Sequence, residues 1–154
     1  DTRAVLAWAR VRKDVARTPK GVVGWCMSGS FTLAAAGEIP DEVGAAATLY
    51  GVAMVTDKPD SPHLLAPRIK AGLYCAFAER DRWVPANVVP DLRAALTAAK
   101  TEFEIEDFPR TEHGFQFPER AAVYSRDAAE RAWEKIFALF ARRLQGKGVA
   151  AATQ

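Results

Sequence analysis

The chain has 154 residues, of which 49% are hydrophobic and 26% are charged. This is enough for one domain with a substantial core, expected over residues 1–144, followed by a flexible tail from Gln145 to Gln154. The 21 basic and 19 acidic residues are spread along the chain, and no apolar run is long enough to cross a bilayer. We therefore expect neither a nucleic-acid partner nor a membrane.

The predicted elements alternate between helices and strands. In chain order they are a helix over 2–17, a strand leading to residue 26, a helix over 28–37, a strand over 43–50, a short helix within the loop 57–67, a strand over 72–77, a helix over 87–100, a strand over 103–108 and a helix over 127–144. This alternation predicts an α/β fold with three αβα layers and a mainly parallel sheet of about four strands.

One cysteine stands where the first predicted strand meets a helix. The segment Gly21–Ser30 reads GVVGWCMSGS, with Gly24 and Ser28 two positions either side of Cys26. A nucleophile elbow requires small residues there, because it is a strained turn between strand and helix. The turn also places the sulfur over the first N–H groups of the helix, which favours the thiolate. We predict that Cys26 is a nucleophile and that the Met27 N–H binds an oxyanion.

Two other interpretations of this segment stay open. Most free cysteines are small buried apolar residues, and Cys26 could be one of them. A nucleophile at Ser28 or Ser30 would make the protein a serine esterase or an acyl transferase, although neither serine lies at the centre of the turn. The other cysteine, Cys75, lies inside an apolar run and is predicted to pack in the core.

An acid and a base follow the cysteine along the chain. Asp81 lies in the loop after the third predicted strand, and His113 lies in the loop after the fourth. An α/β-hydrolase presents nucleophile, acid and base in this order. The second histidine, His63, follows Ser61 and Pro62, which resemble the N-cap and first residue of a short helix, so we expect a surface role for it. His113 is therefore the predicted base.

The chain resembles the dienelactone hydrolase family of α/β-hydrolases from about residue 20 to about residue 144. Three motifs carry the resemblance: GWCMSG at 24–29, ERD with VP at 79–85, and HGF at 113–115. It implies an α/β-hydrolase-like fold and hydrolysis of an ester or enol-lactone by a triad of Cys26, Asp81 and His113. It implies no cofactor, and the scattered cysteines and histidines do not form a metal site. A working thiol also favours the reducing cytoplasm.

The chain also departs from the family pattern. The family has further strands, and the missing ones would precede Asp1, together with the second N–H of the oxyanion hole. The family holds a substrate carboxylate with arginines, one of them four positions after the histidine, where this chain has Phe117. A more apolar ester is therefore plausible, with four aromatic residues as either pocket walls or core: Trp25, Trp83, Phe115 and Phe117.

Without the early strands, the residues from Val22 to Trp25 form an apolar sheet edge that invites pairing. We expect an upstream segment of a longer hydrolase, or a second copy of the chain, to pair near Val22. Two functions follow from the sequence. One is a thiol hydrolase acting on a small-molecule ester or lactone, and the other is a binding module that keeps the scaffold but lacks half of the oxyanion site.

Overall fold

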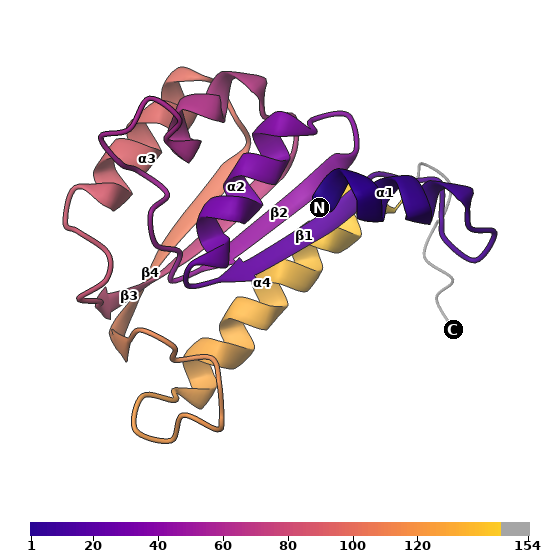
Figure 1. Cartoon of the computed structure of the whole chain (residues 1–154). Helices are drawn as coiled ribbons and strands as arrows, with labels where there is room; N and C mark the ends of the chain where they lie inside the picture. The colour runs from indigo at the N-terminus through magenta and orange to yellow at the C-terminus, as the bar shows by residue number, and fades with distance from the viewer. Residues whose placement is uncertain (146–154) are drawn as a thin grey trace.

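A sheet of four parallel strands forms the centre of the computed structural model, which describes residues 1–145. The strands are β1 (Lys20–Trp25), β2 (Val43–Leu49), β3 (Gly72–Arg80) and β4 (Phe103–Glu112). Their order across the sheet is their order in the chain. Because all run in one direction, their carboxyl ends lie at one edge of the sheet (Figure 1). The predicted sheet is confirmed; the predicted tail, apart from Gln145, lies outside the described residues.

Helices cover both faces of this sheet (Figure 1). One face carries α1 (Thr2–Val11), α2 (Ser28–Glu38), the 3-10 helix η1 (Pro62–Arg68) and α3 (Val88–Ala98). The other face is covered by α4 (Arg126–Leu144). The three predicted layers are therefore present. None of the helices within residues 1–145 combines the length and the hydropathy of a membrane span.

Alternate strand residues divide the core into two clusters, because successive side chains of a strand point to opposite faces. On β3, Leu73, Cys75 and Phe77 pack toward α2 and α3, whereas Tyr74 and Ala76 pack toward α4. Every residue of β2 is buried, as expected for a central strand covered on both faces. The prediction that Cys75 packs in the core is confirmed.

The first helix differs from its prediction. It ends at Val11, before the predicted end at Arg17, because the backbone becomes extended at the next residue. Two residues of its predicted apolar face, Val5 and Trp8, are exposed, and Leu6 is the one buried residue of α1. The helical period identified the helix but not the face that packs.

The aromatic stripe of α4 is also rotated relative to its prediction. Phe137 is 63% exposed and stacks on Trp133 at a ring-centroid distance of 5.5 Å. The buried face instead contains three residues that the predicted stripe omitted: Ala128, Ala132 and Leu139. Since each helical residue is rotated by about 100° from the last, the residue after the buried Ile136 points away from the sheet.

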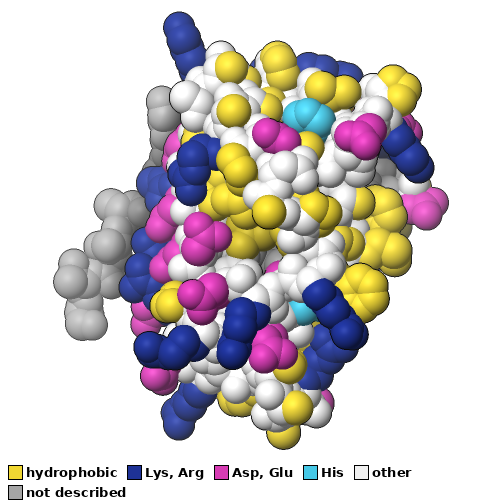
Figure 2. All heavy atoms as spheres, turned by 90° about the vertical axis from the view of Figure 1, so that its left-hand side faces the viewer, with side chains coloured by type: hydrophobic (Ala, Val, Ile, Leu, Met, Phe, Trp, Pro, Cys, Tyr) yellow, Lys and Arg dark blue, Asp and Glu magenta, His cyan; other side chains and the backbone are white. Residues whose placement is uncertain are grey.

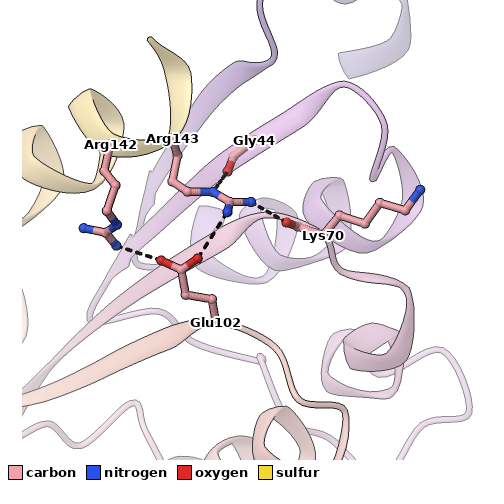
Figure 3. Close-up of polar contacts among 5 residues, drawn as sticks. All are labelled: Gly44, Lys70, Glu102, Arg142 and Arg143. Atoms are coloured by element: carbon pink, nitrogen blue, oxygen red, sulfur yellow. Dashed lines mark hydrogen bonds and ion pairs between the residues drawn. The ribbon is translucent and has the colours of Figure 1, made fainter. Parts of the chain in front are cut away.

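A polar cluster ties the last turn of α4 to the amino ends of three strands (Figure 3). The guanidinium of Arg143 donates to the carbonyl oxygens of Gly44, at 3.1 Å, and Lys70, at 2.6 Å. It also donates to a carboxylate oxygen of Glu102 at 3.1 Å, while Arg142 binds the other oxygen at 2.9 Å. The amino edge of the sheet is thus closed by satisfied polar groups, opposite the edge that carries the predicted site.

Candidate active site

Cys26 occupies a strained turn between β1 and α2. Its φ is 54°, a left-handed conformation that residues with a Cβ rarely adopt. Its N–H donates to the Leu49 carbonyl at 3.1 Å, and its own carbonyl accepts the N–H groups of Gly29 and Val52, each at 3.0 Å. These bonds hold the strained conformation from both sides. Cys26 is exposed at the carboxyl edge of the sheet, so it is not the buried apolar residue of the alternative interpretation.

The two small residues around Cys26 have separate structural reasons. A Cβ on Gly24 would collide with the hydroxyl of Thr32 and with the backbone carbonyl of Ser28. The Ser28 hydroxyl accepts the N–H of Trp25 at 2.8 Å and donates to the carbonyl of the same residue at 2.7 Å. The Ser28 hydroxyl therefore closes the turn, so Ser28 has a structural role.

Met27 provides the first N–H after the cysteine. It is the N-cap residue of α2, and the first N–H groups of a helix have no partner within the helix. The positive end of the helix dipole adds to their attraction for an anion. Met27 is 64% exposed. The structure thus places the Met27 N–H at the start of α2, directly after Cys26.

His113 and Asp81 form a hydrogen-bonded pair. The distance from His113 Nδ1 to Asp81 Oδ2 is 2.7 Å, and their side chains are 12% and 3% exposed. The other carboxylate oxygen, Oδ1, accepts the N–H of Trp83 at 3.0 Å. Asp81 directly follows β3 and His113 directly follows β4, so parallel strands bring them to one edge. Since Nδ1 is bound to Asp81, the free nitrogen of His113 is Nε2.

One cavity joins the thiol and the imidazole. It has a volume of about 570 Å³ and is lined by Cys26, His113, Trp83, Arg120 and a mainly apolar wall of Val52, Ala53, Val55, Thr56 and Pro85. A second hollow of about 950 Å³ shares Trp83, His113 and Arg120 and is otherwise rich in charged residues. Figure 2 looks onto this edge and shows hydrophobic surface between the two histidines, with basic and acidic side chains around it.

The four aromatic residues predicted as possible pocket walls have different positions. Trp83 is 57% exposed and lines both cavities. Phe115 is 0% exposed and packs in the core, so it is not a wall of either cavity. Trp25 packs against Phe117 at a centroid distance of 6.1 Å and donates its indole N–H to Gln116. This pair lies beside the site and is not among the residues that line the cavity of Cys26.

His63 has a local structural role. Its Nδ1 lies 2.7 Å from the hydroxyl of Ser61, which accepts the N–H of Thr56. This histidine is half-buried, although a surface role was expected, and it does not line the cavity of Cys26. The hydroxyl of Ser61 thus fixes the loop after β2 in place of capping η1.

Two residues of this region were missed by the sequence reasoning. Arg120 lines both cavities, and no acidic side chain of residues 1–145 forms an ion pair with it. Its guanidinium lies where a Cβ on Gly114 would stand. Tyr50 packs against the His113 ring at a centroid distance of 4.9 Å. Its position directly after a parallel strand was a usable signal, because sites form at that end of such sheets, whereas Arg120 belongs to no motif.

Within residues 1–145, no group of three or more His, Cys, Asp or Glu side chains is arranged to hold a metal ion. The carboxyl edge of the sheet carries a thiol, an imidazole bound to a buried carboxylate, and the first backbone N–H groups of α2. These are the groups that thiol-dependent acyl transfer requires.

The model of the dienelactone hydrolase family matches residues 1–144. The chain belongs to this family. A candidate carboxymethylenebutenolidase from Synechocystis sp. is 29% identical over 148 residues, which cover 94% of this chain and 59% of that protein. A carboxymethylenebutenolidase homologue from Xenopus tropicalis is 32% identical over 96 residues, which cover 62% of this chain and 36% of that protein.

Solved structures agree with this assignment. A candidate dienelactone hydrolase from Klebsiella pneumoniae superposes with a TM-score of 0.82 at 27% identity, covering 92% of this chain and 59% of that one. A dienelactone hydrolase-like promiscuous phosphotriesterase from metagenomic libraries shares the fold, with a TM-score of 0.79 at 17% identity. The sequence-based family and fold are confirmed. The chain spans about 59% of the length of the first of these relatives.

Proposed function

We propose that this chain carries a Cys-His-Asp site that hydrolyses a small-molecule ester or enol-lactone. The observation that supports it most is one cavity lined by both Cys26 and His113, with the imidazole bound to the buried carboxylate of Asp81 at 2.7 Å. A loop histidine without a task would not need a buried carboxylate, and a structural cysteine would not need a left-handed turn at a helix N-terminus.

The proposed reaction begins with proton transfer from the Cys26 thiol to Nε2 of His113. The thiolate attacks the ester carbonyl, and the oxyanion that forms accepts the N–H of Met27. The imidazolium of His113 then protonates the leaving alkoxide, which leaves an acyl-thioester. Water, deprotonated by the same nitrogen, releases the acid and restores the thiol. Asp81 holds the imidazole in the tautomer with the proton on Nδ1 throughout.

The chemistry of sulfur favours esters and lactones over amides. A thiolate is readily expelled from a tetrahedral intermediate, so it acts best when the other leaving group is comparably good. The wall of Val52, Ala53, Val55 and Pro85 offers apolar contact to the acyl group. Arg120 adds one positive charge to the same cavity. The substrate that fits is an activated ester or lactone with an apolar body. The proposed chemistry needs no cofactor, but it does need a reducing compartment such as the cytoplasm.

The oxyanion site is the point on which the alternative function rests. In α/β-hydrolases a second N–H comes from a loop after an earlier strand. Here β1 is the first strand in the chain and lies at the open edge of the sheet. Loss of one oxyanion donor costs about a hundred- to a thousandfold in rate but leaves the nucleophile in place. The alternative function is therefore that of a scaffold or binding module. For the hydrolase, we propose that another segment pairs with β1 near Val22 and completes the oxyanion site.

Labelling and turnover together test the proposal. Iodoacetamide should alkylate Cys26 much faster than the buried Cys75, whose pKa burial raises to about 12. Hydrolysis of p-nitrophenyl acetate should be lost in Cys26→Ala and kept in the matched control Cys75→Ala. Undiminished turnover by Cys26→Ala would refute the nucleophile. Equal, slow labelling of both cysteines in the native chain would favour the scaffold.

A further inference from the structure

A charged hollow lies next to the apolar cavity of the proposed site. The two share Trp83, His113 and Arg120, but Cys26 lines the apolar cavity alone, whereas Asp81 lines the hollow and not the cavity. The hollow is the larger, at about 950 Å³ against about 570 Å³. The imidazole of His113 therefore stands at the boundary between a space that contains the sulfur and a space that does not.

Some of the charged side chains that line the hollow already have a partner. The guanidinium of Arg80 lies 3.5 Å from the carboxylate of Glu112 and also donates to the Arg110 carbonyl at 3.3 Å. The carboxylate of Asp81 binds the His113 imidazole at 2.7 Å. These charges are neutralised within the protein and are not available to a ligand.

The remaining charges of the hollow are two arginines and one glutamate: Arg82, Arg120 and Glu119. None of the three forms an ion pair with another of residues 1–145. Two positive charges and one negative charge leave a net charge of +1 in the hollow. The hollow is thus suited to a ligand group that carries one negative charge.

Both arginines are held in place by their surroundings. The guanidinium of Arg82 lies over the ring of Trp83, 4.9 Å from its centroid. The backbone N–H of Arg120 donates to the Phe117 carbonyl at 3.0 Å, and the Arg120 carbonyl accepts the N–H of Val123 at 2.9 Å. Groups that are ordered before a ligand arrives lose less conformational freedom when it binds.

The direction of the proposed reaction assigns the two spaces to the two halves of an ester. The acyl group stays on the Cys26 sulfur, so it occupies the apolar cavity that contains the sulfur. The leaving alkoxide takes its proton from Nε2 of His113, so it lies on the imidazole side. The rest of the alcohol portion then extends toward the hollow, which His113 also lines.

We propose that the hollow binds the alcohol portion of the substrate and that Arg82 and Arg120 hold a carboxylate on that portion. The inference rests on the proposed function and narrows its substrate to an open-chain ester with an apolar acyl group and an anionic alcohol group. The planar guanidinium matches a carboxylate in shape, and the net charge of +1 suits a carboxylate better than a doubly charged phosphate. Both arginines keep their protons throughout, and the carboxylate takes no part in the bonds that break.

Two pairs of esters test where the negative charge is bound. In the first pair the alcohol portion carries it: p-acetoxybenzoate is compared with the neutral p-acetoxybenzamide. In the second pair the acyl portion carries it: mono-p-nitrophenyl succinate is compared with p-nitrophenyl butyrate. For each pair, kcat/KM of the charged ester is divided by kcat/KM of the neutral one. A fraction of misfolded protein cancels in this ratio, so variants can be compared with the native chain.

The variants are Arg82→Gln, Arg120→Gln and Glu119→Gln, with Arg93→Gln as the matched control. Arg93 is an exposed arginine on α3 that lines neither the cavity nor the hollow. The ratio for the first pair should fall about fivefold in each of the two arginine variants, mainly through KM, as expected for an exposed charge pair. It should rise in Glu119→Gln, because an opposing charge is lost, and stay native in the control. The ratio for the second pair should stay native in all four variants.

The other outcomes overturn the proposal in distinguishable ways. A native ratio for the first pair in both arginine variants removes the carboxylate from the hollow, while the proposed hydrolase stands. A fall in the ratio for the second pair alone places the charge on the acyl portion. Equal falls for both pairs show a general effect of charge on anionic esters and no site for the alcohol portion. If Cys26→Ala hydrolyses the neutral esters as fast as the native chain, the proposed function fails, and the assignment of the hollow fails with it.

Discussion

Replacement of Asp81 by Asn tests the hydrogen-bonded pair at the proposed site. The Oδ1 atom of Asp81 accepts the Trp83 N–H at 3.0 Å, and Oδ2 lies 2.7 Å from His113 Nδ1. In the variant, the amide oxygen keeps the acceptor position toward Trp83, so the amide NH₂ faces Nδ1. An NH₂ group donates, and Nδ1 must then accept. The imidazole proton moves to Nε2, which can no longer take the proton of Cys26.

The size of the effect follows from burial. The side chains of Asp81 and His113 are 3% and 12% exposed, so water neither screens their interaction nor replaces it. In a Ser-His-Asp triad the equivalent change, with the geometry intact, lowers kcat by about 10⁴-fold. We expect a decrease of about 10³- to 10⁴-fold here, which corresponds to about 4 to 5.5 kcal/mol of transition-state stabilisation.

The assay combines initial rates of p-nitrophenyl acetate hydrolysis with urea unfolding of the native chain and of Asp81→Asn. The matched control is Asp91→Asn, because Asp91 is an exposed carboxylate on α3 that binds only the Asn87 amide in the described part of the chain. The control should keep both its rate and its stability. Asp81→Asn with a native rate and a native fold would show that His113 does not act through this carboxylate, and the proposed triad would be refuted.

Three further changes test other parts of the structure. Gly24→Ala should lower the free energy of unfolding by about 1 to 3 kcal/mol and slow the labelling of Cys26, because the new Cβ collides with backbone at the turn. A variant with the urea unfolding curve and the Cys26 labelling rate of the native chain would contradict this. Arg120→Gln should raise KM about fivefold for a carboxylate-bearing ester but not for its neutral analogue, because an exposed charge pair between Arg120 and the substrate carboxylate contributes about 1 kcal/mol. Equal changes in KM for the two esters would exclude recognition of the carboxylate by Arg120. Burial raises the pKa of Cys75 from 9.0 to about 12, so above pH 9 the unfolded chain loses this proton while the folded chain keeps it, and stability falls with rising pH up to the folded value. Cys75→Ala should lack this loss of about 1.4 kcal/mol in the free energy of unfolding per pH unit, so its urea midpoint should decrease less at alkaline pH than that of the native chain. The prediction would be refuted if the urea midpoints of both proteins changed in parallel with pH.

The elements that position the site could be predicted because their signals are local. Gly24 and Ser28 mark a turn by their size, the apolar run before Asp81 marks a buried strand, and the alternation over residues 103–108 marks the strand before His113. Parallel strands then bring their carboxyl ends to one edge without further information. The order of the strands does not by itself bring Cys26 and His113 together, because β1 and β4 are the two outer strands of the sheet; the loops that follow these strands line one cavity with both residues.

The features that were missed depend on tertiary packing. Phe115 and Phe117 are two residues apart in one loop, yet the first is fully buried and the second is 38% exposed. A hydrophobicity pattern cannot separate them, because both face aromatic neighbours: Tyr50 and Phe108 for one, Trp25 for the other. Arg120 likewise resembles any loop arginine until Gly114 leaves room for its guanidinium beside His113. The sequence gives the types of these residues, but tertiary packing decides which of them are buried and which line the cavity.

The residues with a strained backbone and the polar bonds that close the sheet lie at opposite ends of the strands. Of the five non-glycine residues with positive φ in the described chain, three surround the proposed site: Cys26, Tyr50 and Ala53. Each such residue costs on the order of 1 to 3 kcal/mol and persists only when its surroundings fix it. At the opposite edge, the bonds of Arg143 to two carbonyl oxygens and to Glu102 close the sheet without strain. The completely buried β2 connects the two edges, so packing over its whole length can offset the unfavourable backbone that presents the sulfur.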